Sequence, residues 1–234
     1  MYIAAEASVL FSTDSPSLIK NVIPYYEEQD IKKLENGYYD CILKKPALTD
    51  RSVYTTTSKN THLFDDIASK DFYDLRVLAI TAEYPDYNKI DLSRFEVLIT
   101  IGYTKDLKEL LEKYPKLRVF QTASFKDATA FCEMLLLLMA SDNIIEVDFF
   151  DIALGFASTS EKSKLIHHYS LEEAANAPKS ECYALVYVYT NKKDLFEINT
   201  IYEKYSFLSV PNEFYMACSC NTAIQERNGV FLSY

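Results

Sequence analysis

The sequence predicts an α/β fold, and three observations lead to that prediction. Leu75–Thr81 and Phe95–Ile101 are short apolar runs separated by a turn-rich segment, a pattern typical of buried strands in a parallel or mixed sheet. Residues 124–141 carry apolar side chains at helical spacing, and Met134–Met139 is apolar on every face, which indicates a helix buried on all sides. Cys182–Thr190 alternates and is rich in Tyr and Val, as expected of a strand.

The segment before the first apolar run is only partly interpretable. Residues 1–12 favour a strand, and Ser15-Pro16 favours the start of a helix that Pro24 ends, because Pro is tolerated in a first helical turn and not later. Residues 30–70 give no clear pattern. Within them, residues 51–60 are polar and β-favouring, which suits a strand or a loop.

The segment between the second apolar run and the long helix predicts one helix and one strand. Thr104 is placed to cap a helix that carries Leu107, Leu110 and Leu111 and that Pro115 closes. Val119-Phe120 then suits one more short strand.

Beyond the long helix, the sequence predicts a loop, two helices, the strand at 182–190, another helix and two strands, in that order. We expect helices over 148–154, from the capping box Ser158–Glu161 to Pro178, and over 194–205, with strands at 214–220 and 230–234 and a turn at Asn228-Gly229.

Composition narrows the classes of partner. The chain has 234 residues, 49% hydrophobic and 25% charged, with a net charge of −10, and such a chain repels nucleic acid and anionic lipid. It has no apolar run long enough for a membrane span, and Met1–Phe11 has no basic residue ahead of its apolar stretch, unlike a signal peptide. We therefore expect a cytoplasmic protein, and the odd number of cysteines, five, fits buried free thiols.

Glycine is scarce in this sequence. The four glycines are Gly37, Gly102, Gly155 and Gly229, and no two of them are close together. Loops that wrap phosphate groups need several glycines, which reach positive φ and bring main-chain N–H groups near the anion. The sequence therefore predicts no phosphate-binding loop, no nucleotide cofactor and no GTP binding.

The His and Cys residues do not form a metal-binding pattern. We expect His167 and His168 in a helix, where adjacent side chains point to different faces, and His62 is isolated. Cys218 and Cys220 would share one face of a strand, but no second pair completes a zinc site. No bound metal is expected.

Six short segments from residue 95 onward are notable for their order and spacing along the chain. They occur in the order Phe95-Glu-Val-Leu-Ile-Thr-Ile101, Phe125-Lys-Asp-Ala-Thr-Ala130, Glu146-Val-Asp-Phe-Phe-Asp151, Leu154-Gly-Phe-Ala-Ser-Thr-Ser160, Glu172-Glu-Ala-Ala175 with Pro178, and Asp194-Leu-Phe-Glu-Ile-Asn199. In that order and spacing they resemble FtsZ, the tubulin-like family of bacterial cell division. The third segment, for example, is similar to the family's Asn-Val-Asp-Phe-Ala-Asp.

The resemblance implies a tubulin/FtsZ-like architecture within the α/β class. It implies a reduced Rossmann-like part at 1–122, a long buried central helix at 123–142, and a C-terminal α+β domain at 143–234 with a mixed four-stranded sheet. The family's glycine-rich loop, G-G-G-T-G-[ST]-G, has no counterpart here. The first part therefore resembles a degenerate nucleotide-binding domain.

The resemblance also supplies candidate site residues. In FtsZ-like filaments a loop of one subunit enters the nucleotide site of the next, where its two aspartates orient the attacking water. Asp148 and Asp151 match those positions and are the candidate catalytic residues in trans, and together with Glu146 they are the candidate partner-binding residues. Phe125 is the one remnant of the nucleotide contact, since the guanine-reading position is Thr129. The alternative is that both aspartates only cap the helix that begins there.

These patterns favour an FtsZ-like protein that lacks the GTP-binding loop and acts by protein–protein contact. It would modulate a filament or self-assemble, in cell division or another cytoskeletal process, with an FtsZ-like protein or a second copy as its partner. We do not expect an enzyme in its own right. Two alternatives stay open: a divergent GTPase that polymerises like FtsZ, and a small-ligand binding module on this fold.

Overall fold

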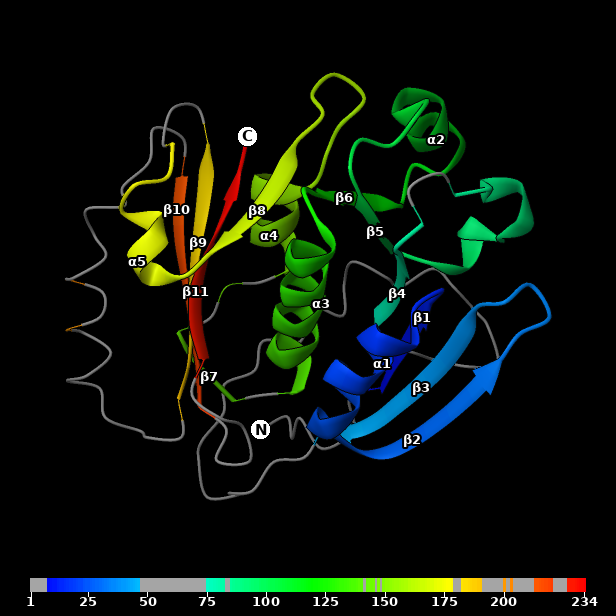
Figure 1. Cartoon of the computed structure of the whole chain (residues 1–234), viewed down its shortest axis with the longest axis horizontal. Coiled ribbons are helices and arrows are strands. Elements are labelled where there is room, and N and C mark those ends of the chain that lie inside the picture. Colours follow the sequence, from blue (N-terminus) through cyan, green and yellow to red (C-terminus); the bar gives the residue numbers. More distant parts are fainter. Residues whose placement is uncertain are drawn as a thin grey trace.

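The computed structural model describes residues 8–46, 75–82, 85–140, 142–145, 147, 149–178, 182–190, 213–220 and 227–234, together with 200 and 203. One mixed sheet of eleven strands runs through this part of the chain, in the order β2-β3-β1-β4-β5-β6-β8-β11-β9-β10-β7 (Figure 1). The strands are β1 Ser8–Thr13, β2 Tyr26–Lys33, β3 Tyr39–Pro46, β4 Leu75–Ile80, β5 Val97–Ile101, β6 Arg118–Thr122, β7 Asp142–Ile145, β8 Leu165–Tyr169, β9 Tyr183–Thr190, β10 Glu213–Cys220 and β11 Arg227–Ser233.

The helices lie on both faces of this sheet. They are α1 Pro16–Val22, α2 Leu107–Lys113, α3 Phe125–Ala140, α4 Phe149–Phe156 and α5 Leu171–Ala174, with short 3-10 turns η2 Ile23–Tyr25, η4 Tyr87–Lys89 and η5 Leu92–Arg94. Within the described ranges, no helix is long and apolar enough to cross a bilayer.

The middle of the sheet is parallel. Strands β1, β4, β5, β6 and β8 all run in one direction, so their carboxyl ends lie along a common edge. Antiparallel strands flank this block: the β2–β3 hairpin on one side and β11 on the other, followed by β9, β10 and β7. Strands β9 and β10 are parallel to each other.

The long helix α3 is the centre of the largest core. Its residues Phe131 and Leu136 are fully buried, and it lies against one face of the sheet with α1 and α4 beside it (Figure 1). The Phe131 ring contacts Phe120 of β6, Phe156 of α4 and Phe231 of β11 at centroid distances of 5.1, 6.4 and 5.4 Å. Residues 134–137, which lie on successive faces of α3, are all buried, in agreement with the apolar circumference of this stretch.

Two smaller cores cover the opposite face of the sheet. One lies under α2, η4 and η5 and includes Leu78, Leu98 and Leu110. The other lies under α5 and includes Ala184, Val186 and Leu232. Because β4, β5 and β9 are covered on both faces, they have the nearly continuous apolar sequences that parallel strands require.

The prediction of a helix from Ser158 to Pro178 was wrong. The segment after Ser158 closes a turn in which Thr159 N donates to Lys162 O at 2.8 Å, and the strand β8 follows because it pairs with β11. The capping box lies further on, where Ser170 and Glu173 begin the short helix α5. His167 and His168 are therefore in a strand and point to its two faces.

Two further expectations need correction. Asn228 and Gly229 lie inside β11 and not in a turn, because Gly229 gives the room that the His168 and Tyr187 side chains occupy. The C-terminal strands do not form a separate four-stranded sheet, because Gln121 and Thr122 extend β6 until it pairs with β8.

The β2–β3 hairpin had no clear sequence pattern. It is a regular antiparallel pair closed by a turn in which Gly37 has a φ of +88° and Leu34 N donates to Tyr38 O. β2 is exposed along most of its length, so no alternation of apolar and polar residues marks it.

Some predicted segments fall on residues outside those described. Residues 1–7 and 51–60 are in this group. Of the helix predicted over 194–205, only Thr200 and Glu203 are described, and both are helical. Three of the cysteines, Cys41, Cys132 and Cys182, are buried free thiols, as expected.

Candidate functional site

The structure describes two of the four candidate site residues. Glu146 and Asp148 lie outside the described residues. Asp151 is half-buried in the first turn of α4, and Phe125 is the exposed first residue of α3. These two residues thus begin different helices on the same face of the sheet.

The carboxyl edge of the parallel strands is the natural place to look for a ligand. In α/β sheets ligands bind outside the carboxyl ends of the strands, where successive connections leave toward opposite faces. Here β5 connects to α2 on one face, and β6 connects to α3 on the other. The loops after β1, β4, β5 and β6 therefore line this edge.

An aspartate of the chain occupies the main-chain donors at the end of β4. Asp14, which follows β1, accepts hydrogen bonds from Thr81 N at 2.8 Å and Thr81 Oγ1 at 3.0 Å through Oδ1, and from Ala82 N at 2.9 Å through Oδ2. These are the donor types that hold phosphate in nucleotide-binding proteins. A phosphate at this point would have to displace a carboxylate of the same chain and would be repelled by its charge.

The surroundings of Asp14 are acidic and rich in tyrosine. Burial, followed by the charges of Asp14, Tyr87 and Asp86, raises the pKa of Tyr38 to about 12. Burial also raises the pKa of Tyr87, against a hydrogen bond with Thr104 that lowers it. A neutral phenol beside carboxylates is a hydrogen-bond donor and does not balance the charge of an anion.

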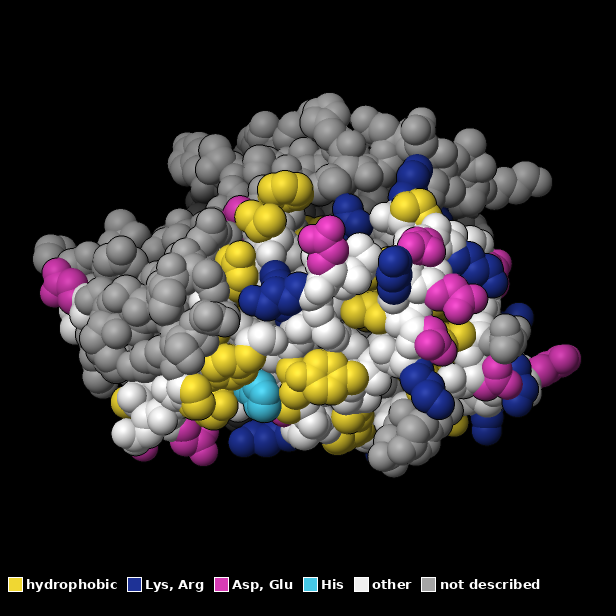
Figure 2. Space-filling model, turned by 90° about the horizontal axis from the view of Figure 1, so that it is seen from above, with side chains coloured by type: hydrophobic (Ala, Val, Ile, Leu, Met, Phe, Trp, Pro, Cys, Tyr) yellow, Lys and Arg dark blue, Asp and Glu magenta, His cyan; other side chains and the backbone are white. Residues whose placement is uncertain are grey.

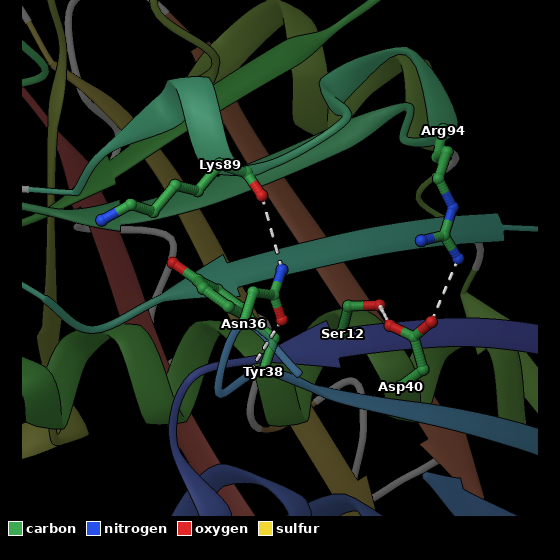
Figure 3. Close-up of polar contacts among 6 residues, drawn as sticks. All are labelled: Ser12, Asn36, Tyr38, Asp40, Lys89 and Arg94. Carbon is green, nitrogen blue, oxygen red and sulfur yellow. Dashed lines mark hydrogen bonds and ion pairs between the residues drawn. The ribbon is translucent and has the colours of Figure 1, made fainter. Parts of the chain in front are cut away.

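Two of the nearby basic side chains are bound to carboxylates of the chain. Lys89 Nζ lies 3.3 Å from Asp86 Oδ2, and Arg94 Nη2 lies 3.0 Å from Asp40 Oδ2. Asp40 also accepts from Ser12 Oγ at 2.5 Å, and Asn36 Nδ2 donates to Lys89 O at 3.4 Å (Figure 3). These contacts fasten the β2–β3 hairpin to η4 and η5.

The buried side chain of Gln121, on β6, is the centre of a hydrogen-bond network with neighbouring loops. Gln121 is fully buried, and its Nε2 donates to Ser158 Oγ at 2.7 Å and Ser163 Oγ at 2.6 Å, while its Oε1 accepts from Thr104 N. Such a satisfied network holds the loops rigidly together.

The amino-terminal end of α3 is also held by hydrogen bonds within the chain. Ser124 Oγ accepts from Asp127 N at 3.2 Å and donates to Asp127 Oδ2 at 2.6 Å, and Asp127 Oδ1 accepts from His168 N at 2.9 Å. Thr129 donates its hydroxyl to Phe125 O at 2.8 Å. The carboxylate of Asp127 thus supplies the negative charge that a helix N-terminus favours.

Helix α4 presents apolar side chains outward beside the candidate loop. Phe150 and Leu154 are 55% and 50% exposed, and their spacing of four residues puts them on one side of the helix. Phe149 turns inward, with its ring 6.2 Å from that of Phe120. An exposed apolar pair on a firmly packed helix suits contact with another protein.

A buried lysine holds the carboxyl end of α4. Lys164 Nζ donates to Leu154 O at 2.8 Å and to Gly155 O at 2.9 Å, and it lies 4.4 Å from the centroid of the Tyr183 ring. Burial, and then the charge of Lys162, lowers the pKa of Lys164 to about 8. Sequence reasoning missed this residue, because a Lys between a polar loop and an apolar strand has no distinguishing pattern.

The lowered pKa of Lys164 gives a testable pH dependence. Between pH about 8 and the ordinary lysine value of 10.5, the unfolded chain binds this proton more tightly than the folded chain, so stability rises with pH. Urea titrations at several pH values are expected to show this as a slope difference between the wild type and Lys164→Met, of up to about 1.4 kcal/mol per pH unit. Parallel pH profiles for the two proteins would contradict this assignment.

On the face seen in Figure 2, the charged side chains of the described residues are not segregated by sign. Acidic and basic side chains are intermixed over one half of that face, and hydrophobic side chains flank a histidine on the other half. Within the described part of the chain, no group of three or more His, Cys, Asp or Glu residues is placed to hold a metal ion.

The fold is that of a mixed α/β protein, with a large sheet covered by helices on both faces. No protein-family model matches the chain, and no curated protein matches it. Among solved structures it is similar to a point mutant of FtsZ from M. jannaschii, with 17% identity and a TM-score of 0.32 over 67% of this chain and 55% of that chain. An empty FtsZ dimer from M. jannaschii gives 17% identity and a TM-score of 0.32 over 67% of this chain and 53% of that chain.

The chain thus spans about half the length of the solved FtsZ chains that it matches. Both similarities are weak, and they bear on the fold alone.

Proposed function

We propose that this chain is an FtsZ-like protein that acts by protein–protein contact and does not turn over GTP. It would modulate an FtsZ-like filament, or assemble with its own copies, in cell division or another cytoskeletal process. The observation that carries the proposal is the carboxylate of Asp14 on the Thr81 and Ala82 amides. In this arrangement the chain's own carboxylate satisfies the main-chain donors at the end of β4 and would repel a triphosphate.

The contact with a partner is assigned to α4 and the loop before it. Phe150 and Leu154 provide exposed apolar area, and the six-segment resemblance matches Asp148 and Asp151 to the two aspartates that meet the next subunit of a filament. In this proposal Asp151, half-buried in the first turn of the same helix, belongs to the polar rim of the apolar pair. Apolar anchors inside a polar rim are the usual anatomy of a protein interface.

Sedimentation with purified FtsZ tests the proposal. Adding the wild-type chain to FtsZ polymerising with GTP is expected to change the pelleted polymer mass or the rate of GTP turnover. The double variant Phe150→Ser, Leu154→Ser is expected to need at least about tenfold more protein for the same effect, since loss of interface anchors costs more than about 1 kcal/mol each. The matched control is Tyr103→Ser, which removes an aromatic side chain that is 67% exposed after β5 and is expected to behave as the wild type.

Two outcomes would contradict the proposal. An unchanged FtsZ polymer, in both mass and turnover, would remove the filament-modulating role. Saturable binding of labelled GTP with magnesium at micromolar protein would restore the divergent GTPase.

A further inference from the structure

The strand β2 ends the sheet on one side. No described strand lies beyond it in the sheet order, and it forms the outer margin of the hairpin in Figure 1. Leu34 N donates to Tyr38 O at the closed end of the hairpin, and residues two apart in an antiparallel pair bond to the same side. Counting back along the unbroken register, Gln29, Ile31 and Lys33 therefore turn their main-chain N–H and C=O groups away from β3.

The side chains of this edge are ordered so that they complement themselves. Asp30 precedes Ile31, and Lys32 and Lys33 follow it. Ile31 is 45% exposed. Charged residues on an edge strand discourage pairing with arbitrary strands, but an acid-then-base order matches a second copy that runs in the opposite direction.

Antiparallel pairing about Ile31 gives a consistent set of neighbours. A two-fold axis through Ile31 would place each Ile31 beside its copy and each Asp30 opposite Lys32 of the other strand. Gln29 would lie opposite Lys33. The Ile31–Ile31 and Gln29–Lys33 pairs carry the main-chain groups that point away from β3. Opposite charges and apolar residues in directly opposed positions stabilise such pairs.

We propose that β2 is an interface for a second copy of this chain, which pairs antiparallel with it about Ile31 and joins the two sheets into one. The proposal depends on β2 alone and is independent of the proposed function. A one-strand contact buries less area than a standard protein interface, so the dimer is weak and forms at micromolar concentrations or above.

Sedimentation equilibrium on the full chain, up to roughly 300 μM, is the test. The average mass of the wild type is expected to rise with concentration, from the mass of one chain toward that of two. Asp30→Lys and Lys32→Asp each put like charges opposite one another twice, so each alone is expected to dimerise at least about tenfold more weakly. An equimolar mixture of the two variants is expected to recover the wild-type association, because each supplies the charge that the other lacks.

A third variant separates loss of pairing from loss of folding. Ile31→Pro replaces the exposed Ile31 side chain and removes a main-chain N–H group that points away from β3. An edge strand tolerates Pro at such a position, so this variant is expected to be a folded protein with the mass of one chain. Circular dichroism checks the fold of all variants, which matters for Lys32→Asp because Lys32 also lies opposite Asp40. A wild type that stays single at the highest concentration, or a dimer that survives both Asp30→Lys and Ile31→Pro, would overturn the proposal.

Discussion

Replacing Phe131 by Ala is expected to lower the free energy of unfolding by about 3–5 kcal/mol, the usual cost of emptying a buried phenylalanine site. Phe131 is fully buried, and its ring touches β6, α4 and β11 through Phe120, Phe156 and Phe231. The loss is expected near the top of that range, because the cavity walls belong to three different elements and cannot close together.

Urea or thermal unfolding followed by circular dichroism measures this effect. The matched control is Lys126→Ala, an exposed residue one turn earlier on α3, which is expected to change the free energy of unfolding by less than about 0.5 kcal/mol. Equal effects for the two variants would show that α3 is not the centre of the core.

The second large effect is expected at Gly229. A Cβ atom there would lie 2.6 Å from His168 Nε2 and 2.8 Å from Tyr187 Oη, two atoms that hydrogen-bond to each other at 2.9 Å. The His168 ring is also held against Phe231, with centroids 4.9 Å apart. Gly229→Val is therefore expected to cost about 2–4 kcal/mol, from overpacking and the lost hydrogen bond, although Val is the better strand former.

A second glycine provides a control substitution, which is expected to raise the stability and not to lower it. At Gly155 in α4, a Cβ atom would meet Tyr183 Cδ1 at 3.4 Å, an ordinary contact, and Gly in a helix costs about 0.5–1 kcal/mol relative to Ala. Gly155→Ala is expected to stabilise the protein by a similar amount. If Gly229→Val proved as stable as the wild type in the same urea titrations, the packing described around His168 would be wrong.

Segments with a strong periodic pattern were predicted best from the sequence. The helix α3 and the strands β4, β5, β9 and β10 agree with their predicted positions to within a few residues. In α3, β4, β5 and β9 most side chains are buried, so the apolar pattern reflects the faces that each element covers. The edge strand β2 and the strand β8 were missed. β2 is exposed on both faces, and β8 follows a Ser-x-x-Glu segment that resembles a helix start but closes a turn instead.

The candidate site residues stay predictions. The scarcity of glycine gives the expectation of no phosphate-binding loop, and the resemblance alone supplies Phe125 and Asp151 as candidates. The hydrogen bonds of Asp14 could not be predicted, because the donors on Thr81 and Ala82 are 67 and 68 residues away in the sequence. Long-range contacts of this kind depend on which strands become neighbours.

The junction between β6 and β8 has a consequence for how the molecule comes apart. Only two residue pairs, Gln121 with Leu165 and Thr122 with Ile166, join these neighbouring strands, so the backbone ladder is shortest in the middle of the sheet. The rings of α3 and α4 span this junction and connect its two sides. Cooperativity between the two halves therefore depends more on side chains than on the backbone, and weakening that aromatic layer is expected to separate one unfolding transition into two.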